Sequence, residues 1–331
     1  PFGPARNGLI PFVAAGDLYV GDLATGTTRV LLSSSANEAA PGFSPDGTRL
    51  AFFRDVPGPP AAATSPIDIY VMREDGTDVT RITSSPLAKV VWATWTPDGR
   101  NLAVIHPVDG VNRLELLDAD GTRPPRRLDA AINADSIAFR PPDGREILFR
   151  ALVGGQYGLF VMEADGSNVR TLVQTTSTAD LGQDLNAATY SADGYRIFYQ
   201  RWFPDSIQLW VMNTDGTDPH EFVSEPGPGW DGLADPSPDG RWVAYWHVIE
   251  DGRATQQVSV VRADGTGPII PTGPELTGTA HWVWSPDSTK ILMMPDGGTS
   301  ATALLLDPTG GPWTTVPWSS DADLDWQRLA P

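Results

Sequence analysis

The sequence predicts an all-β protein: a seven-bladed β-propeller with four antiparallel strands in each blade. Three observations lead to this fold class. Two turn motifs alternate along the chain, each lies between short apolar runs of strand length, and the pattern repeats about every 47 residues. No stretch shows helical periodicity over a convincing length, so strands account for the whole repeat.

The first motif is a Pro-Asp-Gly turn, as in residues 43–53, which read FSPDGTRLAFF. Its aspartates are Asp46, Asp98, Asp143, Asp193, Asp239 and Asp287, with Ala192 replacing the proline in one copy and Ser288 the glycine in another. Asp-Gly between β-rich runs is a strong hairpin signal, because glycine accepts a positive φ without strain from a Cβ atom. We expect these aspartates to stabilise their own turns rather than to bind calcium.

The second motif is a glycine followed by Thr or Ser, usually after Asp. Its copies are Gly26, Gly76, Gly121, Gly166, Gly216, Gly265 and, in a weaker form, Gly310. It joins the third strand of a repeat to the fourth, as between the runs at 68–72 and 79–83. Each period therefore contains two hairpins, and four antiparallel strands make one propeller blade.

The two ends of the chain supply complementary parts of one blade. The first strands lead into Phe43, Trp95, Phe139, Tyr190, Pro236, Trp284 and Trp326. No second, third or fourth strand follows Trp326, whereas residues 9–15, 17–21 and 28–32 supply these three strands without a first one. We expect the ends to pair, which closes the ring and removes an exposed sheet edge. The prediction is a single β-propeller domain over residues 1–331.

The first strands also suggest how the blades pack. All but one of the seven positions named above are aromatic, whereas the residue before each is mostly small. These preceding residues are Gly42, Thr94, Ala138, Thr189, Asp235, Val283 and Asp325. Because strand residues alternate between faces, we expect one face of each blade to be bulky and the other lean, so that neighbouring blades interdigitate. Most of the 12 tryptophans are then core residues.

Composition excludes several classes of function. The net charge is −18, from 41 acidic and 23 basic residues, which argues against nucleic acid as a partner. There is no cysteine, so disulfides, thiolate metal sites and a cysteine nucleophile are excluded. No apolar run approaches the roughly 18 residues that a transmembrane segment needs.

The repeat resembles that of the TolB-like, WD-like propeller family. The likeness is carried by Asp68–Met72 followed by Asp75-Gly76-Thr77, then by Arg81-Ile82-Thr83 and by Trp95–Gly99, and it extends over essentially the whole chain. Members of this family serve as periplasmic interaction scaffolds, as propeller domains of serine peptidases and as some lyases. The resemblance implies an exported protein, in the periplasm, at the cell surface or secreted.

The chain also departs from the members of that family. TolB has an additional N-terminal domain and usually six blades, whereas this acidic chain shows seven repeats and no such domain, so we do not expect it to be TolB itself. The peptidases need a hydrolase domain with a Gly-x-Ser-x-Gly elbow, which is absent. The lyases use a His-rich metal site, and only four histidines occur here.

Candidate binding residues lie in the loops that precede the first strands. These loops and those between second and third strands share one face, the loop face, whereas the two hairpin turns lie on the opposite face, the turn face. We expect a ligand-binding funnel rim formed by Glu38, Lys89, Asp135, Asp184, Trp230, Asp231, His281, Asp321 and Asp323. Such a carboxylate-rich rim would suit a basic peptide, and the one cofactor it suggests is a calcium ion in the central channel. The insertion at 57–66 lies on the same face.

Two functions follow from this reading. The first is a non-enzymatic interaction scaffold whose funnel docks a protein or peptide partner or a small ligand, because no catalytic motif is assembled. The alternative is a carbohydrate-active enzyme, a polysaccharide lyase or glycoside hydrolase, with its active site in the same funnel. A carboxylate pair such as Asp184 with Asp231 would serve it. His106, His247 and His281 also lie on the loop face but lack the spacing of a zinc site.

Overall fold

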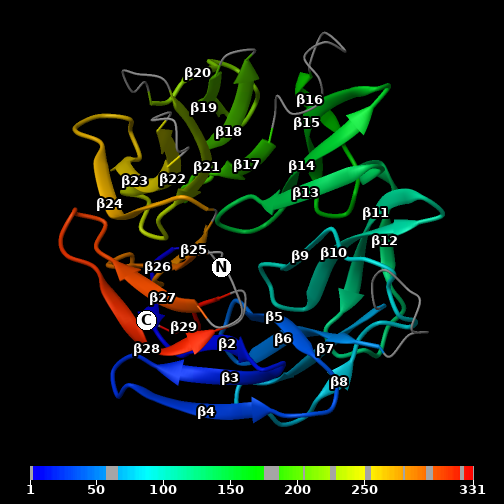
Figure 1. Cartoon of the computed structure of the whole chain (residues 1–331). Coiled ribbons are helices and arrows are strands. Elements are labelled where there is room, and N and C mark those ends of the chain that lie inside the picture. The colour runs from blue at the N-terminus through cyan, green and yellow to red at the C-terminus, as the bar shows by residue number, and fades with distance from the viewer. Residues whose placement is uncertain are drawn as a thin grey trace.

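The structure is a computed structural model that describes residues 3–56, 66–174, 186–203, 206–223, 229–249, 255–278, 280–295, 301–320 and 324–330. Within it, the backbone alone is described for residues 186, 187, 229, 230 and 249. Seven sheets surround a central axis in chain order, which confirms the predicted seven-bladed propeller (Figure 1). Most of the insertion at 57–66 lies outside the described residues.

The first blade contains β2 (Ile10–Ala14), β3 (Asp17–Asp22) and β4 (Thr27–Leu32). The other blades are β5 (Glu38–Phe43), β6 (Arg49–Asp55), β7 (Ile67–Arg73) and β8 (Thr80–Arg81); β9 (Trp92–Trp95), β10 (Asn101–Val108), β11 (Val111–Asp118) and β12 (Arg126–Leu128); β13 (Ala134–Phe139), β14 (Glu146–Val153), β15 (Gln156–Glu163) and β16 (Arg170–Gln174); β17 (Asn186–Tyr190), β18 (Arg196–Phe203), β19 (Ser206–Asn213) and β20 (His220–Glu221); β21 (Gly229–Pro236), β22 (Trp242–Ile249), β23 (Thr255–Arg262) and β24 (Ile270–Leu276); and β25 (Ala280–Trp284), β26 (Ile291–Pro295), β27 (Ala301–Leu306) and β28 (Thr314–Ser320). One 3-10 helix, η1 (Asp129–Ala131), precedes β13.

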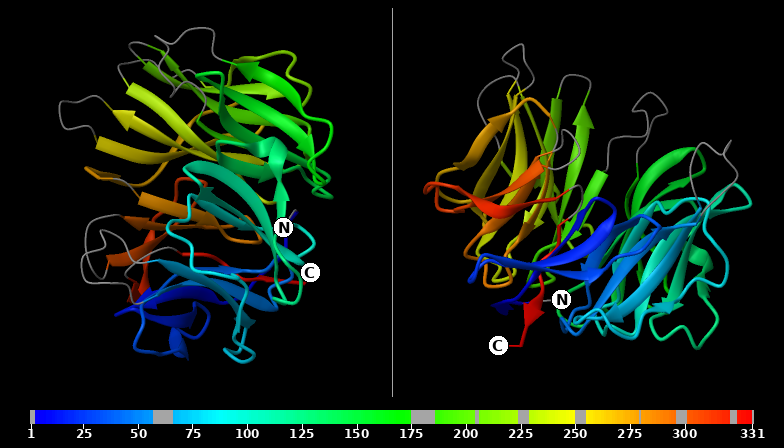
Figure 2. Two further views of the ribbon diagram at one scale, coloured as in Figure 1. Left: turned by 90° about the vertical axis from the view of Figure 1, so that its right-hand side faces the viewer. Right: turned by 60° about the horizontal axis from the view of Figure 1, so that its bottom comes forward.

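The ends of the chain close the ring as predicted. β1 (Arg6–Asn7) pairs antiparallel with β29 (Arg328–Leu329), and both lie on one side of the ring (Figure 2). Next to this pair, the Gly8 amide donates to the Gln327 carbonyl at 2.9 Å, and the Gln327 amide donates to the Leu9 carbonyl at 2.9 Å. The segment with Trp326 therefore lies beside the start of β2, in the place of a first strand. The first sheet itself consists of β2, β3 and β4.

The repeated aspartates are turn residues, as predicted. Asp46 Oδ1 accepts hydrogen bonds from Ser44 Oγ at 2.6 Å and from the Thr48 amide at 3.1 Å. Burial alone would raise the pKa of Asp46, but these hydrogen bonds outweigh it and lower the pKa. Equivalent bonds to a hydroxyl or amide two residues away are made by Asp75, Asp98, Asp165, Asp193, Asp215, Asp239, Asp264, Asp287 and Asp307.

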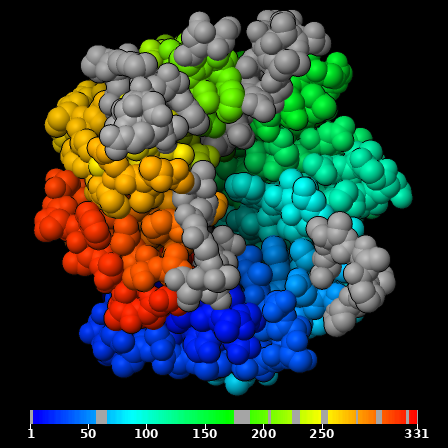
Figure 3. Space-filling model, in the orientation of Figure 1, coloured from blue at the N-terminus to red at the C-terminus, as the bar shows by residue number. Residues whose placement is uncertain are grey.

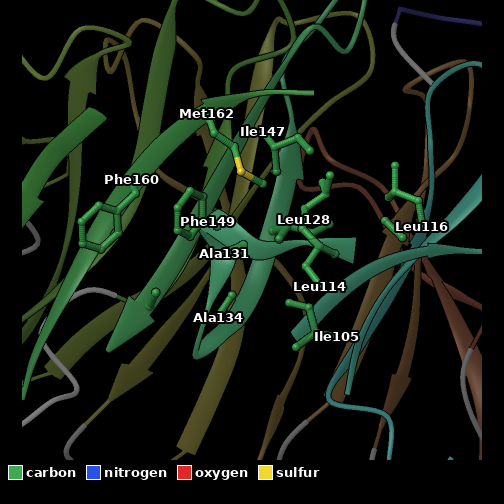
Figure 4. Close-up of a cluster of buried hydrophobic side chains, with 13 residues drawn as sticks. Ile105, Leu114, Leu116, Leu128, Ala131, Ala134, Ile147, Phe149, Phe160 and Met162 are labelled. Carbon is green, nitrogen blue, oxygen red and sulfur yellow. The ribbon is translucent and has the colours of Figure 1, made fainter. Parts of the chain in front are cut away.

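The hydrophobic core lies between the blades. Each of the clusters among the described buried residues joins two neighbouring blades, and the cluster between β10–β12 and β13–β15 is shown in Figure 4. It contains Ile105 and Leu114 from one blade and Ile147, Phe149 and Met162 from the next. Burying a side chain of this size contributes roughly 1.5–3 kcal/mol, so each blade is stable only beside its neighbours. The space-filling view shows successive blades in contact around the ring (Figure 3).

Tryptophan side chains also link the inner strands of neighbouring blades by hydrogen bonds. The indole Nε1 of Trp95 donates to the carbonyl of Gly42 at 3.0 Å, and that of Trp284 donates to the carbonyl of Asp235 at 2.8 Å. In each pair the indole comes from the last residue of a first strand, and the carbonyl precedes the corresponding residue of the blade before it. The repeated aromatic position is therefore a core position that also fixes the backbone beside the axis.

Ring closure can be tested at Gly47, which has a φ of 71° and lies against the carbonyl of Arg328 in the C-terminal strand. We expect Gly47→Ala to lower the free energy of unfolding by about 3 kcal/mol, from left-handed backbone strain plus displacement of β29. Gly110→Ala is the matched control, because Gly110 has a φ of 78° with no atom near its missing Cβ. The Gly110→Ala substitution should lower the free energy of unfolding, measured with urea, by only about 1 kcal/mol. Equal losses in the two variants would contradict closure through β29.

Candidate functional site

A cavity of about 820 Å³ lies at the centre of the ring near the loop face. Its walls come from the first strands of five blades, β9, β13, β17, β21 and β25, with Arg150 of β14. These strands are the ones nearest the axis (Figure 1). A second cavity of about 800 Å³ continues along β5, β9 and β13, and a third of about 320 Å³ lies toward the turn face. Together these cavities make a central channel.

The small residues that precede the repeated aromatic positions line this channel. All of them appear in the cavity walls, and we call them the channel ring: Gly42, Thr94, Ala138, Thr189, Asp235, Val283 and Asp325. Packing between blades, their predicted role, holds for Ala138 and Val283, which lie against core clusters, but the whole set also borders the channel. The first strand is innermost, so the residue that alternates with the core aromatic faces the axis. Small side chains keep the channel open at this level.

The channel ring contains two carboxylates, Asp235 and Asp325. Of these, Asp235 lines the 820 Å³ cavity. The pairing of β21 with β22 shifts between Gly232 and Asp235, and Leu233 in this bulge has a φ of 54°. Bulges of this kind redirect side chains and are common beside functional sites. Burial raises the pKa of Asp235 to about 7. Within the described part of the chain, no ion pair includes Asp235.

Asp325 is the other carboxylate of the channel ring, and it helps to hold the C-terminal segment. Its Oδ2 accepts a hydrogen bond from the Phe43 amide at 2.6 Å, which joins the first blade to the second. Burial raises the pKa of Asp325. Arg328 lines the same 320 Å³ cavity, and burial lowers the pKa of its guanidinium. The turn end of the channel is therefore occupied by the closing segments of the chain.

Asp135, a predicted rim residue, also lines the 820 Å³ cavity. Its Oδ2 lies 2.5 Å from Arg150 Nη1, and the Arg150 guanidinium stacks over the ring of Tyr157 at 3.9 Å from the ring centroid. Burial raises the pKa of Asp135, and the charge of Arg150 acts in the opposite direction. The cavity wall thus has one carboxylate with a paired cation and one, Asp235, without.

The other predicted rim residues have different surroundings. His281 is exposed and lines the same cavity as Asp135. Glu38 is buried, and its Oε1 accepts hydrogen bonds from Ser34 Oγ at 2.7 Å and Arg54 Nε at 2.9 Å. Asp231 is buried and lies 2.8 Å from His247 Nδ1.

The remaining predictions cannot be placed in the same detail. Lys89 is exposed in the loop before β9. Asp184, Asp321 and Asp323 lie outside the described residues, as does the side chain of Trp230.

Exposed apolar side chains also lie on the loop face of the ring. They lie at the ends of strands and in the loops of the loop face, and we call them the apolar rim: Trp92, Ile132, Leu152, Val153, Phe203 and Leu233. Trp92 and Leu233, 43% and 44% exposed, also line the cavity. In the sequence these residues extend apolar strand patterns, so they were indistinguishable from core. Asp235 and Asp325 carried a usable signal, since they are the carboxylates at an otherwise uncharged position of the repeat.

The described residues offer no metal centre. In those parts of the chain, no group of three or more His, Asp or Glu side chains could hold a metal ion. Calcium also takes carbonyl and hydroxyl oxygens as ligands, so the calcium ion that the sequence suggested stays a prediction. No helix in the described residues is long and apolar enough to cross a membrane.

The fold and channel define a seven-bladed β-propeller with a central cavity, and comparisons with known proteins add to this description. No family model matches the chain. TolB of the Tol-Pal system from Anaeromyxobacter dehalogenans is 30% identical over 162 residues, covering 47% of this chain and 30% of that protein. An uncharacterized protein of Agrobacterium fabrum is 26% identical over 191 residues, covering 57% of this chain and 48% of that protein. The chain thus spans less than half the length of these curated relatives.

Solved structures show the same fold at low identity. TolB from Acinetobacter baumannii superposes with a TM-score of 0.61 at 17% identity, covering 96% of this chain and 81% of that one. An oligogalacturonate lyase in complex with manganese gives a TM-score of 0.67 at 13% identity, covering 94% and 85%. A periplasmic gluconolactonase from Pseudomonas aeruginosa gives 0.63 at 16% identity, covering 98% and 99%. The chain is similar to TolB and shares its propeller fold, as its repeats indicated.

The raised pKa of Asp235 makes stability depend on pH. In the unfolded chain this carboxyl ionises near pH 4, whereas in the folded protein it stays neutral until about pH 7. Stability is therefore lost as pH rises from 4 to 7, and the loss is complete above 7. We expect Asp235→Asn to match the wild type at pH 4 and to be more stable by about 1–3 kcal/mol at pH 8.

Urea unfolding at pH 4, 6 and 8 measures this difference. The control is Asp218→Asn, because Asp218 is exposed on the turn face with a φ of 54°, a conformation that asparagine tolerates. A stability difference between Asp235→Asn and the wild type that does not change with pH would contradict a buried, neutral Asp235.

Proposed function

We propose that this protein is a non-enzymatic interaction scaffold that docks a peptide segment of a partner protein at the loop-face mouth of its channel. The observation that carries the proposal is a cavity of about 820 Å³ whose wall includes the exposed apolar side chains Trp92 and Leu233, with the rest of the apolar rim on the same face. Exposed apolar side chains gathered around a concavity are typical of binding sites rather than of solvated surface. A rigid ring with loops on one face is a suitable support for such a site.

The charge of the protein favours a neutral or basic partner. The net charge of −18 would repel nucleic acid and acidic proteins, and it would increase the rate of association with basic ones. The resemblance to TolB, a protein of the Tol-Pal system, supports a protein partner. Export to the periplasm, cell surface or medium forms part of the proposal, supported by the same resemblance and by the fold shared with a periplasmic gluconolactonase.

The fold shared with an oligogalacturonate lyase does not favour the enzymatic alternative on its own. At 13% identity it shows the fold, and unrelated functions occur on one propeller scaffold. The described residues of this channel do not assemble a metal centre. We therefore treat turnover of a carbohydrate as an outcome that the experiment below must be able to detect.

Peptide selection tests the proposal. A random dodecapeptide library displayed on phage is selected on the immobilised protein, and enriched peptides are measured by isothermal titration calorimetry. We expect Trp92→Ala to weaken binding about tenfold, because aromatic anchors at the centre of an interface contribute most of the affinity. Tyr195→Ala is the matched control, since Tyr195 is 70% exposed in a turn on the opposite face.

Two results would count against the proposal. One is enriched peptides that bind Trp92→Ala and the wild type equally well, which would place the site elsewhere. The other is formation of unsaturated products from oligogalacturonate, with or without manganese, abolished by substitutions in the channel, which would identify an enzyme.

A further inference from the structure

We propose that the channel binds a lysine side chain of the docked peptide, with the ammonium group held at Asp235. The inference rests on the proposed function, because it names the chemical group that the peptide inserts. It concerns the inner part of the cavity, below the apolar rim.

The first argument is an unbalanced charge in the cavity wall. Among the described residues, two carboxylates line the 820 Å³ cavity, Asp135 and Asp235. Asp135 is matched by Arg150, which is itself buried and stacked on Tyr157. Asp235 forms no ion pair within the described residues. A carboxylate in a partly desolvated cavity is stabilised in its charged form by a cation from outside the chain.

The second argument is the hydrogen-bonding capacity beside Asp235. The channel ring places the hydroxyl-bearing Thr189 at the equivalent position of the neighbouring blade. An ammonium group has three donors, and a carboxylate together with this hydroxyl can accept from it. A guanidinium would bring five donors to a wall that is otherwise largely apolar, as at Ile137 and Val283. A metal ion would need a group of ligands that the described residues do not supply.

The third argument is the path to Asp235. Trp92 and Trp282 line the cavity, and Trp282 is held edge-on against Trp246 with ring centroids 5.1 Å apart. Indole faces attract ammonium groups, and an apolar wall accommodates the methylene stem of lysine. Trp92 and Leu233 belong to both the apolar rim and the cavity, so a peptide lying on the rim has its side chains above the channel.

The site also predicts a pH dependence. Because the pKa of Asp235 is about 7, most of this carboxyl is neutral at pH 6 and ionised at pH 8, so affinity for a lysine probe should rise about tenfold between them. The other titratable or charged groups that line the cavity, among the described residues, are Asp135, Arg150 and His281, with Asp325 and Arg328 in the lower cavity. Asp235→Asn is therefore needed to assign the effect to this carboxyl.

Small probes test the ammonium site directly. Nα-acetyl-lysine amide is titrated at pH 8 and monitored by ligand-observed NMR, beside its Nε-acetyl derivative, Nα-acetyl-arginine amide and spermidine. We expect the lysine probe to bind best, to weaken at least tenfold in Asp235→Asn and a few-fold in Thr189→Val, and to be unchanged in Asp218→Asn. Thermal unfolding of each variant establishes that it is folded.

The outcomes separate this inference from the proposed function. Equal binding of the neutral Nε-acetyl probe, or undiminished binding by folded Asp235→Asn, overturns the ammonium site. If spermidine binds much more tightly than the lysine probe, the ligand is a free polyamine and the proposed lysine side chain is wrong. Selected peptides that lack lysine yet need Trp92 would support the peptide-binding function and contradict the lysine site. Asp235-dependent binding of the lysine probe, with no peptide enriched from the library, would support the lysine site and contradict the peptide-binding function.

Discussion

The structure depends on the contact between the two ends of the chain. In the other blades a short turn joins the first strand to the second, whereas in the first blade that turn is replaced by pairing of β1 with β29. The contact extends to the second blade, because Gln327 Nε2 donates to the Gly47 carbonyl at 2.7 Å and Asp325 accepts from the Phe43 amide. Without it, Trp326 would leave the core cluster between the last blade and the first. Every blade needs both neighbours to bury its faces, so closure stabilises the whole ring.

Closure also creates the channel and determines its chemistry. Repeats that are equivalent in sequence become equivalent around an axis, so one position of the repeat forms a ring of side chains. A charged residue at that position in one repeat is then a charged group in the middle of the molecule. The bulge in β21 and the indole of Trp284 hold the backbone around Asp235 in place. A closed and well-packed scaffold can retain a carboxylate in an unfavourable environment, and such local conflicts are characteristic of functional sites.

The candidate site was only partly visible in the sequence. Two of the predicted rim residues, Asp135 and His281, line the cavity, because loops before first strands lie close to the axis, and their role in binding stays a prediction. Chain order gave no means of knowing that Glu38 and Asp231 are used in buried contacts with Arg54 and His247. Those contacts join different strands, and their geometry follows from the register of each blade. The apolar rim was hidden for a related reason, since an apolar residue at the end of a strand has the same pattern whether it is buried or exposed.

The sequence by itself determined the fold class, the number of blades, the closure by the termini and the role of the repeated aspartates. These features rest on local chemistry, such as the bonds of Asp46 to groups two residues away, and on a pattern repeated often enough to be unambiguous. Only the tertiary structure decided which face of the innermost strands meets the axis, which carboxylates acquire partners, and where burial shifts a pKa. Those properties depend on the curvature of the ring, on bulges and on contacts between distant segments, and no local pattern in the chain encodes them.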